Sequence, residues 1–196
     1  MQMIVLRESA YVCVPWKNGG GQTREIHREP PGPAAFDWRL SLAAVDRGGP
    51  FSAFEGYDRT LVLVRGAGIE LSFGPHGQAK LSAVGQVVSF DGGWPTSCTL
   101  LDGPSTDLNL IVSQERSQFT SRCLSVPGRQ LIPTAGWSET LVCCVSGSVQ
   151  ITNTAGAMEE LAAVDIARCF PLDGLATCRA LGSGAAQIFI AAIRAR

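Results

Sequence analysis

The chain has 196 residues, of which 45% are hydrophobic and 17% are charged, and its formal net charge is −1. This composition supports a buried core and excludes a disordered chain. Without a block of like charges, the chain is not expected to bind nucleic acid or an anionic membrane surface, since basic patches usually meet such partners.

The N-terminal residues do not resemble a secretory signal, because Arg7 and Glu8 interrupt the apolar run at 1–6. No stretch approaches the roughly 18 apolar residues that a membrane-spanning helix needs. We therefore expect a soluble, cytoplasmic protein with no membrane partner.

The segment 15–26, PWKNGGGQTREI, has an unusual composition. Its three glycines allow positive φ and close approach of the backbone, and Lys17 and Asn18 precede them. One interpretation is a loop that places Lys17 and Asn18 over a ligand. The other is a simple glycine turn between strands. The spacing of a phosphate-binding P-loop is absent.

The segment 36–43, FDWRLSLA, alternates as a half-buried strand does. Three apolar side chains lie on one face, and Arg39 and Ser41 lie on the other. Arg39 and Ser41 then point either into a pocket or into water, and a slip of one residue in register exchanges these outcomes.

An aromatic, glycine-rich loop at 49–59 contains Ser52 and Phe54 and leads to Arg59. The Arg59 guanidinium is suited to a bidentate pair with a ligand carboxylate. Alternatively, it forms a structural ion pair with an acidic residue of the chain: Glu55, Asp58 or Asp107.

The remaining regular segments are short and apolar, as at 61–64, 87–90, 108–112 and 187–191. Their length and β-branched content predict an all-β sandwich or barrel, with a short helix allowed near 113–119. Asp107 and Asn109 share one face of a strand, where burial would require a polar partner.

An internal repeat emerges when the sequence is shifted by 80 positions. Thr60-Leu61-Val62 then matches Thr140-Leu141-Val142, and Cys98 matches Cys178. The repeated unit of short strands and glycine turns resembles half of a bicupin. We expect two cupin-like β-barrels from an internal duplication, at 1–112 and 113–196, forming one compact bicupin with strands that can be exchanged between the halves.

The two halves differ in polarity at the matched positions. Under the same shift, Arg59 corresponds to Glu139, Asp107 to Gln187 and Asn109 to Phe189. We infer that the first barrel holds a ligand pocket and that the second is mainly structural.

Metal and disulfide chemistry are not expected. The seven cysteines form no CxxC motif, and the two histidines, His27 and His76, are far apart. We predict buried reduced thiols, no metal and no cofactor.

Several ordered motifs together resemble the HutD/Ves family from about residue 4 onwards. They are the segment 15–26, Trp38-Arg39-x-Ser41, Gly49-Pro-Phe-Ser-x-Phe54 with Asp58-Arg59-Thr60, Phe90-Asp91-Gly92 and Asp107-Leu-Asn109. The resemblance implies an RmlC-like jelly-roll bicupin associated with histidine utilisation. It also implies a role in tuning expression of that pathway, by sensing a metabolite such as formylglutamate or urocanate.

Our leading hypothesis is a binding protein for a small anionic metabolite. Its expected ligand-binding residues are Lys17, Asn18, Arg39, Ser41, Ser52, Phe54, Arg59, Asp107 and Asn109. One alternative is a metal-free enzyme acting on a small carboxylic acid, with Asp107 as general base. Another is a stress-linked protein that binds a partner and no ligand. The sequence leaves open whether the chain is a monomer or a homodimer.

Overall fold

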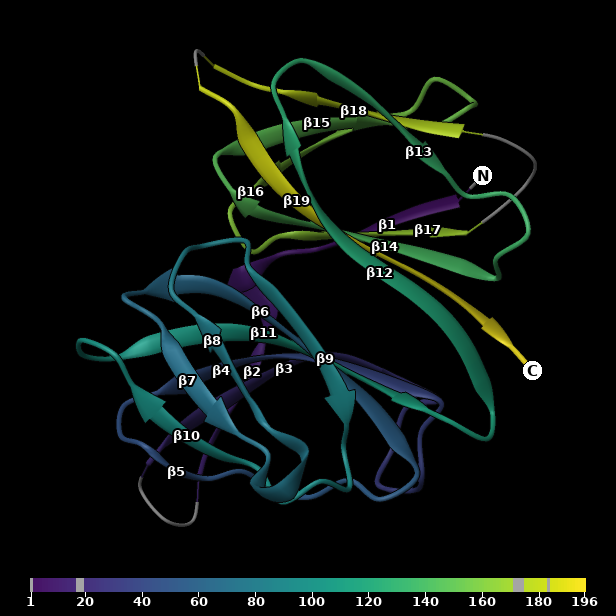
Figure 1. The fold of residues 1–196 in the computed structure, drawn as a ribbon. Helices are drawn as coiled ribbons and strands as arrows, with labels where there is room; N and C mark the ends of the chain where they lie inside the picture. Colours follow the sequence, from purple (N-terminus) through teal and green to yellow (C-terminus); the bar gives the residue numbers. More distant parts are fainter. Residues whose placement is uncertain (1, 17–19, 171–174, 183) are drawn as a thin grey trace. The chain divides into compact units, whose positions relative to one another are not determined.

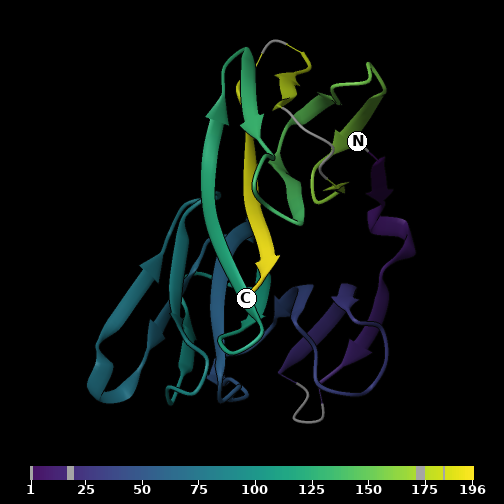
Figure 2. The same ribbon diagram turned by 90° about the vertical axis from the view of Figure 1, so that its right-hand side faces the viewer.

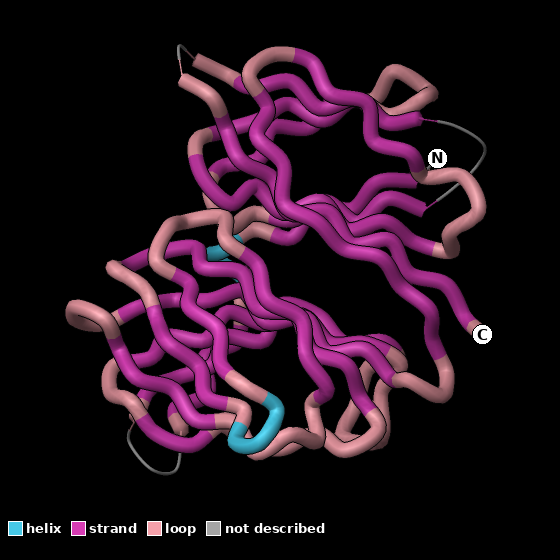
Figure 3. Tube along the Cα trace, in the orientation of Figure 1, coloured by secondary structure: helices cyan, strands magenta, loops and turns pink. Residues whose placement is uncertain are grey.

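The computed structural model describes residues 2–16, 20–170, 175–182 and 184–196. In these ranges the regular structure is β-strand, apart from two short 3-10 helices at Glu8–Ala10 and Gly74–His76 (Figure 3). Short helices were allowed in the connections, and these two are present, but the position near 113–119 is wrong, because one strand ends at Ser113 and the next begins at Ser117. No helix in the described part of the chain is long and apolar enough to cross a membrane.

The chain divides into two compact units (Figure 1). The N-terminal unit holds residues 11–117 with Arg196, and the C-terminal unit holds residues 1–10 with 118–195. The boundary expected from the sequence lay between 112 and 113. The observed division falls a few residues later and assigns the first ten residues to the C-terminal unit.

The N-terminal unit has two sheets. The larger runs in the order β2 (Val12–Pro15), β3 (Gly21–Glu29), β4 (Trp38–Val45), β11 (Ser105–Ser113), β6 (Tyr57–Gly66) and β9 (Val87–Asp91). The smaller runs in the order β5 (Gly49–Pro50), β10 (Ser97–Leu100), β7 (Ile69–Ser72) and β8 (Gln78–Leu81).

The C-terminal unit also has two sheets. The larger runs in the order β1 (Gln2–Leu6), β17 (Ile166–Phe170), β14 (Glu139–Ser146), β19 (Ala186–Ala195) and β12 (Ser117–Val126). The smaller runs in the order β13 (Arg129–Pro133), β18 (Leu175–Ala180), β15 (Ser148–Thr152) and β16 (Met158–Ala162). Figure 2 shows the yellow β19 beside the teal-green β12.

The two units share one strand order. β4-β11-β6-β9 corresponds to β12-β19-β14-β17, and β5-β10-β7-β8 corresponds to β13-β18-β15-β16. The N-terminal unit adds β2 and β3 beside β4, whereas the C-terminal unit adds β1 beside β17. Within the described residues, the N-terminal unit has ten strands and the C-terminal unit has nine, and the two are variations on one jelly-roll plan.

The shift of 80 positions that aligns the two halves in sequence is one residue too short for β6 and β11, which correspond to β14 and β19. Leu61 pairs with Asn109, and the core residue Val142 pairs with Ile190 in the same way. Each pairing is followed by a register shift, between Thr106 and Asp107 in one unit and between Cys144 and Ser146 in the other. In register, Arg59 thus corresponds to Thr140, Asp107 to Ile188 and Asn109 to Ile190.

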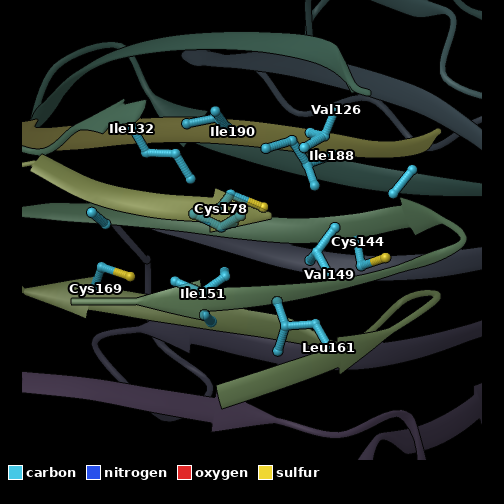
Figure 4. Packing of buried hydrophobic residues seen from close by; sticks show 14 residues of the cluster. Val126, Ile132, Cys144, Val149, Ile151, Leu161, Cys169, Cys178, Ile188 and Ile190 are labelled. Atoms are coloured by element: carbon cyan, nitrogen blue, oxygen red, sulfur yellow. The ribbon is translucent and has the colours of Figure 1, made fainter. Parts of the chain in front are cut away.

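Each unit has its own apolar core between its two sheets. In the N-terminal unit, Leu61 and Leu63 of β6 pack with Ile69 and Leu71 of β7. In the C-terminal unit, residues of β14, β15 and β19 form the corresponding cluster, in which Cys144, Val149 and Ile188 are fully buried (Figure 4). These cores fix which side chains of the large sheets point inward.

Candidate functional site

The inner face of the six-stranded sheet carries polar side chains in adjacent rows. One row runs from Arg28 through Arg39, Ile111 and Arg59 to Phe90. Directly paired residues of antiparallel strands project to the same face. Because Phe90 belongs to the core between the sheets, the three arginines of this row also point inward.

The next two rows add further polar groups. Ser41 pairs with Asn109, which pairs with the core residue Leu61. Asp107 pairs with the core residue Leu63. We call the inward-facing set the arginine face, which comprises Arg28, Arg39, Ser41, Arg59, Asp107 and Asn109.

Aromatic rings surround the guanidinium groups of the arginine face. The guanidinium of Arg59 lies 5.3–5.4 Å from the ring centroids of Phe51, Phe54 and Phe90. That of Arg39 lies 5.0 Å from the Phe54 ring centroid. The ring of Phe36 is in turn shared by Arg39 and Arg28, at 5.4 and 4.8 Å. Such contacts hold planar cations in place without neutralising their charge.

Many buried polar atoms of the arginine face lack hydrogen-bond partners. Among the described residues, eight buried side-chain atoms have none, and seven of them belong to this face. They are the Nε atoms of Arg28, Arg39 and Arg59, both carboxyl oxygens of Asp107, Ser41 Oγ and Asn109 Oδ1. An unpaired buried polar group costs about 1–3 kcal/mol, so a bound molecule or water is needed here.

Burial perturbs the charges of this face. The pKa of Asp107 rises to about 7 because burial disfavours the carboxylate, although the nearby charge of Arg59 opposes the rise. The pKa of Arg59 falls to about 10, also because of burial; Asp107 opposes this fall and Arg39 adds to it. Glu25, which pairs with Ser41, offsets part of the charge of Arg39. The face nevertheless carries three desolvated arginines, an excess of positive charge that suits an anion.

The alternative of a structural ion pair for Arg59 is not what the geometry shows. The guanidinium donates instead to the carbonyl oxygen of Ser52, at 3.1 Å. Asp58 accepts a hydrogen bond from Gln114 at 2.9 Å, and neither carboxyl oxygen of Asp107 has a partner among the described residues. Arg59 Nε is thus left available for a ligand.

A divalent metal does not fit the arginine face. Three guanidinium groups would repel a cation, and no group of three His, Cys, Asp or Glu side chains suited to a metal occurs among the described residues. His27 contacts Glu29 at 3.2 Å, and His76 stacks on Trp94 with ring centroids 4.4 Å apart.

The comparisons with known proteins point to one family. The HutD family model matches residues 8–188. The chain is 32% identical over 174 residues to an uncharacterized 21.2 kDa protein in the hutC 3′ region of Pseudomonas putida, with 88% of each chain covered. It is 30% identical over 167 residues to Protein Ves of Citrobacter koseri, covering 85% of this chain and 81% of that protein.

This chain belongs to the HutD family.

Solved structures agree with this assignment. HutD from Pseudomonas fluorescens SBW25 matches with a TM-score of 0.82 and 33% identity, and all of both chains is covered. A protein of unknown function from Pseudomonas aeruginosa PAO1 matches with a TM-score of 0.88 and 32% identity over 99% and 100% of the two chains. Oxalate decarboxylase from Lactobacillus farciminis matches with a TM-score of 0.65 at 11% identity over 98% and 86%, a likeness of fold alone.

Most of the expected site residues of this HutD family protein lie together. Arg39, Ser41, Arg59, Asp107 and Asn109 form the arginine face, so Arg39 and Ser41 point between the sheets and not into water. Phe54 contacts two of the arginines, and Ser52 contributes its carbonyl oxygen while its side chain is exposed. Lys17 and Asn18 lie outside the described residues.

The sequence reasoning missed Arg28. The alternation of β3 changes phase at a register shift between Glu25 and His27, after which Arg28 pairs with Arg39. A bulge of this kind leaves no clear signal in a single sequence. Phe51 and Phe90 lie within the family motifs, and Phe36 begins the segment 36–43. Nothing in the sequence showed that these three rings surround guanidinium groups.

Proposed function

We propose that the arginine face binds a small anionic metabolite through a carboxylate, and that the protein thereby senses or buffers this metabolite in the cytoplasm. The chain belongs to a family linked to histidine utilisation, so the metabolite is expected to come from that pathway. Formylglutamate and urocanate are the candidates. The observation that carries the proposal is the set of seven unpartnered polar atoms on one buried, positively charged face.

Carboxylate recognition accounts for these features. A carboxylate can accept hydrogen bonds from several guanidinium groups, and charge-assisted bonds of this type are the strongest available. Ser41 Oγ and Asn109 Oδ1 can then bond with the other polar groups of the ligand. The HutD of P. fluorescens was solved in a formate condition, and formate is the smallest carboxylate.

A thermal-shift screen of metal-stripped protein tests the proposal. The candidates are histidine, urocanate, formiminoglutamate, formylglutamate and glutamate. A ligand at ~100 times its dissociation constant adds about 2.7 kcal/mol to the free energy of unfolding, which raises the midpoint measurably. We expect one acid to raise the midpoint and the Arg59→Ala variant to abolish the rise.

Arg65→Ala is the matched control, because Arg65 lies on the same strand but is exposed. It should keep the ligand-induced rise. Unchanged midpoints with every acid would refute the metabolite proposal and favour the partner-binding alternative. A rise that persists in Arg59→Ala would place binding elsewhere in the chain.

One observation favours an enzymatic alternative. The buried Asp107 carboxyl has its pKa raised to about 7, within the range that suits a general acid or base at neutral pH. If the protein is an enzyme, the bound acid should be consumed when followed by NMR. Asp107→Asn should then abolish turnover and retain binding, whereas a pure binding protein shows no turnover in either form.

A further inference from the structure

The C-terminal unit, expected from the sequence to be mainly structural, contains a cavity of about 320 Å³. Residues of several elements line it, including Thr120 and Arg122 of β12, Pro133 of β13, Trp137, and Ile190 and Ala192 of β19. Ile190 also belongs to the core of this unit, where Figure 4 shows it near Ile132. Ile190 therefore joins the cavity wall to the apolar core, whereas Thr120, Arg122 and Pro133 are exposed, so the cavity is open to solvent.

The lining combines apolar walls with one cation. Trp137, Pro133 and Ile190 supply the apolar surface. Arg122, which is exposed, is the only charged side chain among the described residues of the lining. None of the described lining residues is acidic. This chemistry differs from that of the arginine face and suits a ligand that is mostly apolar and carries a single negative charge.

The indole of Trp137 is held in place from outside the cavity. The guanidinium of Arg194 lies 5.1 Å from the centroid of the Trp137 ring, and Arg194 is not among the lining residues. Arg194 is fixed in turn by Gln118 Oε1, which accepts hydrogen bonds from its Nε and Nη2 atoms at 3.0 and 2.8 Å. A ligand thus meets an aromatic wall that needs little reorganisation.

A buried polar side chain lies beside the cavity, although it is not among the described lining residues. Thr140 is fully buried, and its Oγ1 has no hydrogen-bond partner among the described residues. Thr140 pairs directly with Ala192, which lines the cavity, so both side chains lie on the same face about 5 Å apart. In register, Thr140 occupies the position of Arg59 in the N-terminal unit.

We propose that this cavity binds a small planar monocarboxylate, whose apolar body packs against Trp137 and Ile190 and whose carboxylate pairs with Arg122. The protein then has two binding sites at related positions in its two units. The arginine face takes a strongly polar anion, and the cavity of the C-terminal unit takes a largely apolar one. This second site is independent of the proposed function of the first.

Titration calorimetry with cinnamate as the probe tests the site, and cinnamamide serves as an uncharged molecule of the same shape. We expect cinnamate to bind and cinnamamide to bind about 2- to 5-fold more weakly, because the pair with the exposed Arg122 is absent. Arg122→Ala should weaken cinnamate binding by about 2- to 5-fold, because water screens an ion pair made by an exposed arginine. The matched control Arg179→Ala, which changes an exposed arginine of the same unit, should retain binding.

Ala192→Leu provides a second test that removes no polar group. A leucine at this position fills part of the cavity, so the probe should be excluded while the thermal midpoint stays near that of the parent. A large fall in the midpoint would mean that the region is already packed, which would overturn the proposal.

Arg59→Ala separates the two sites. It should leave cinnamate binding unchanged, since Arg59 lies in the N-terminal unit. No detectable binding of cinnamate overturns the proposed site. Binding that survives both Arg122→Ala and Ala192→Leu does the same, because it shows that cinnamate occupies another part of the chain.

Discussion

Arg59 is a cation with only 3% of its surface exposed, and its neighbours on the inner sheet face include two further arginines. Removing a charge from water is unfavourable unless an opposite charge or several hydrogen bonds compensate. Asp107 compensates poorly because burial raises its own pKa to about 7, and Glu25 acts on the charge of Arg39. The buried charges of the arginine face are thus expected to lower the stability of the fold unless a ligand or water compensates them.

The pH dependence of stability should reveal Asp107. Its pKa is about 7 in the folded chain and ~3.9 when unfolded, so the folded state binds more protons between these values. The free energy of unfolding therefore falls as pH rises from about 4 to 7, by at most ~4 kcal/mol from this group. Asp107→Asn should remove that loss, so its advantage over the parent grows with pH.

Urea unfolding of both proteins between pH 4 and pH 8 measures this difference. Asp102→Asn is the control, because Asp102 is exposed in the same unit, and it should follow the parent curve. If the free energy of unfolding depends on pH in the same way for the parent and Asp107→Asn, the pKa of Asp107 is not raised by folding.

Strand β1 adds a distant piece of chain to the C-terminal unit. It pairs with β17 from Gln2↔Phe170 to Leu6↔Ile166. Asp165 holds the segment that follows, because its carboxylate accepts hydrogen bonds from Glu8 N at 3.1 Å and Arg7 Nη1 at 3.0 Å. It also accepts one from the backbone of Ala162 at 3.1 Å.

Removing the Asp165 carboxylate should release β1. We expect Asp165→Ala to lower the free energy of unfolding by ~2–4 kcal/mol, since several hydrogen bonds to a charged group are lost together. Amide hydrogen exchange should show faster exchange in β1, whereas β6 keeps its protection. The exposed Glu160→Ala is the control and should change neither quantity. Unaltered hydrogen exchange in β1 would show that pairing with β17 holds this strand in place without the Asp165 carboxylate.

The sequence predicted much of the fold at the level of elements. The short β-branched runs at 61–64, 87–90, 108–112 and 187–191 all lie within strands. The face of the sheet on which each side chain lies was harder to predict, because a bulge reverses the inward and outward alternation of the residues beyond it. The bulge near Ile26 concealed Arg28, and matching residues by identity placed Glu139 at the position that Thr140 occupies in register.

At the scale of the whole molecule, two units of one topology differ in the polarity of their interiors. Asp107 and Asn109 correspond in register to Ile188 and Ile190. The C-terminal unit thus retains an apolar core at the positions where the N-terminal unit carries its polar groups. This is the contrast between halves inferred from the sequence, although the residues that express it are different ones.

Exchanging residues between equivalent positions should have asymmetric effects. Ile190→Asn should cost about 2–4 kcal/mol, because it places an amide in an apolar core. Asn109→Ile should change the free energy of unfolding by less than ~1 kcal/mol or increase it, because it removes an unpartnered buried oxygen. Urea unfolding measures both variants. If both variants lose a similar amount of unfolding free energy, then the side chain of Asn109 is stabilised in the folded chain as well as that of Ile190 is.

The position of β1 also affects how the molecule is assembled during synthesis. The ribosome makes β1 before the whole N-terminal unit, yet β17, the partner of β1, is made after it. The N-terminal unit can therefore form its sheets while β1 is still unpaired. The C-terminal unit can fold only after the last strands have left the ribosome. A tag fused before β1 is thus expected to disturb the half of the molecule that is translated last.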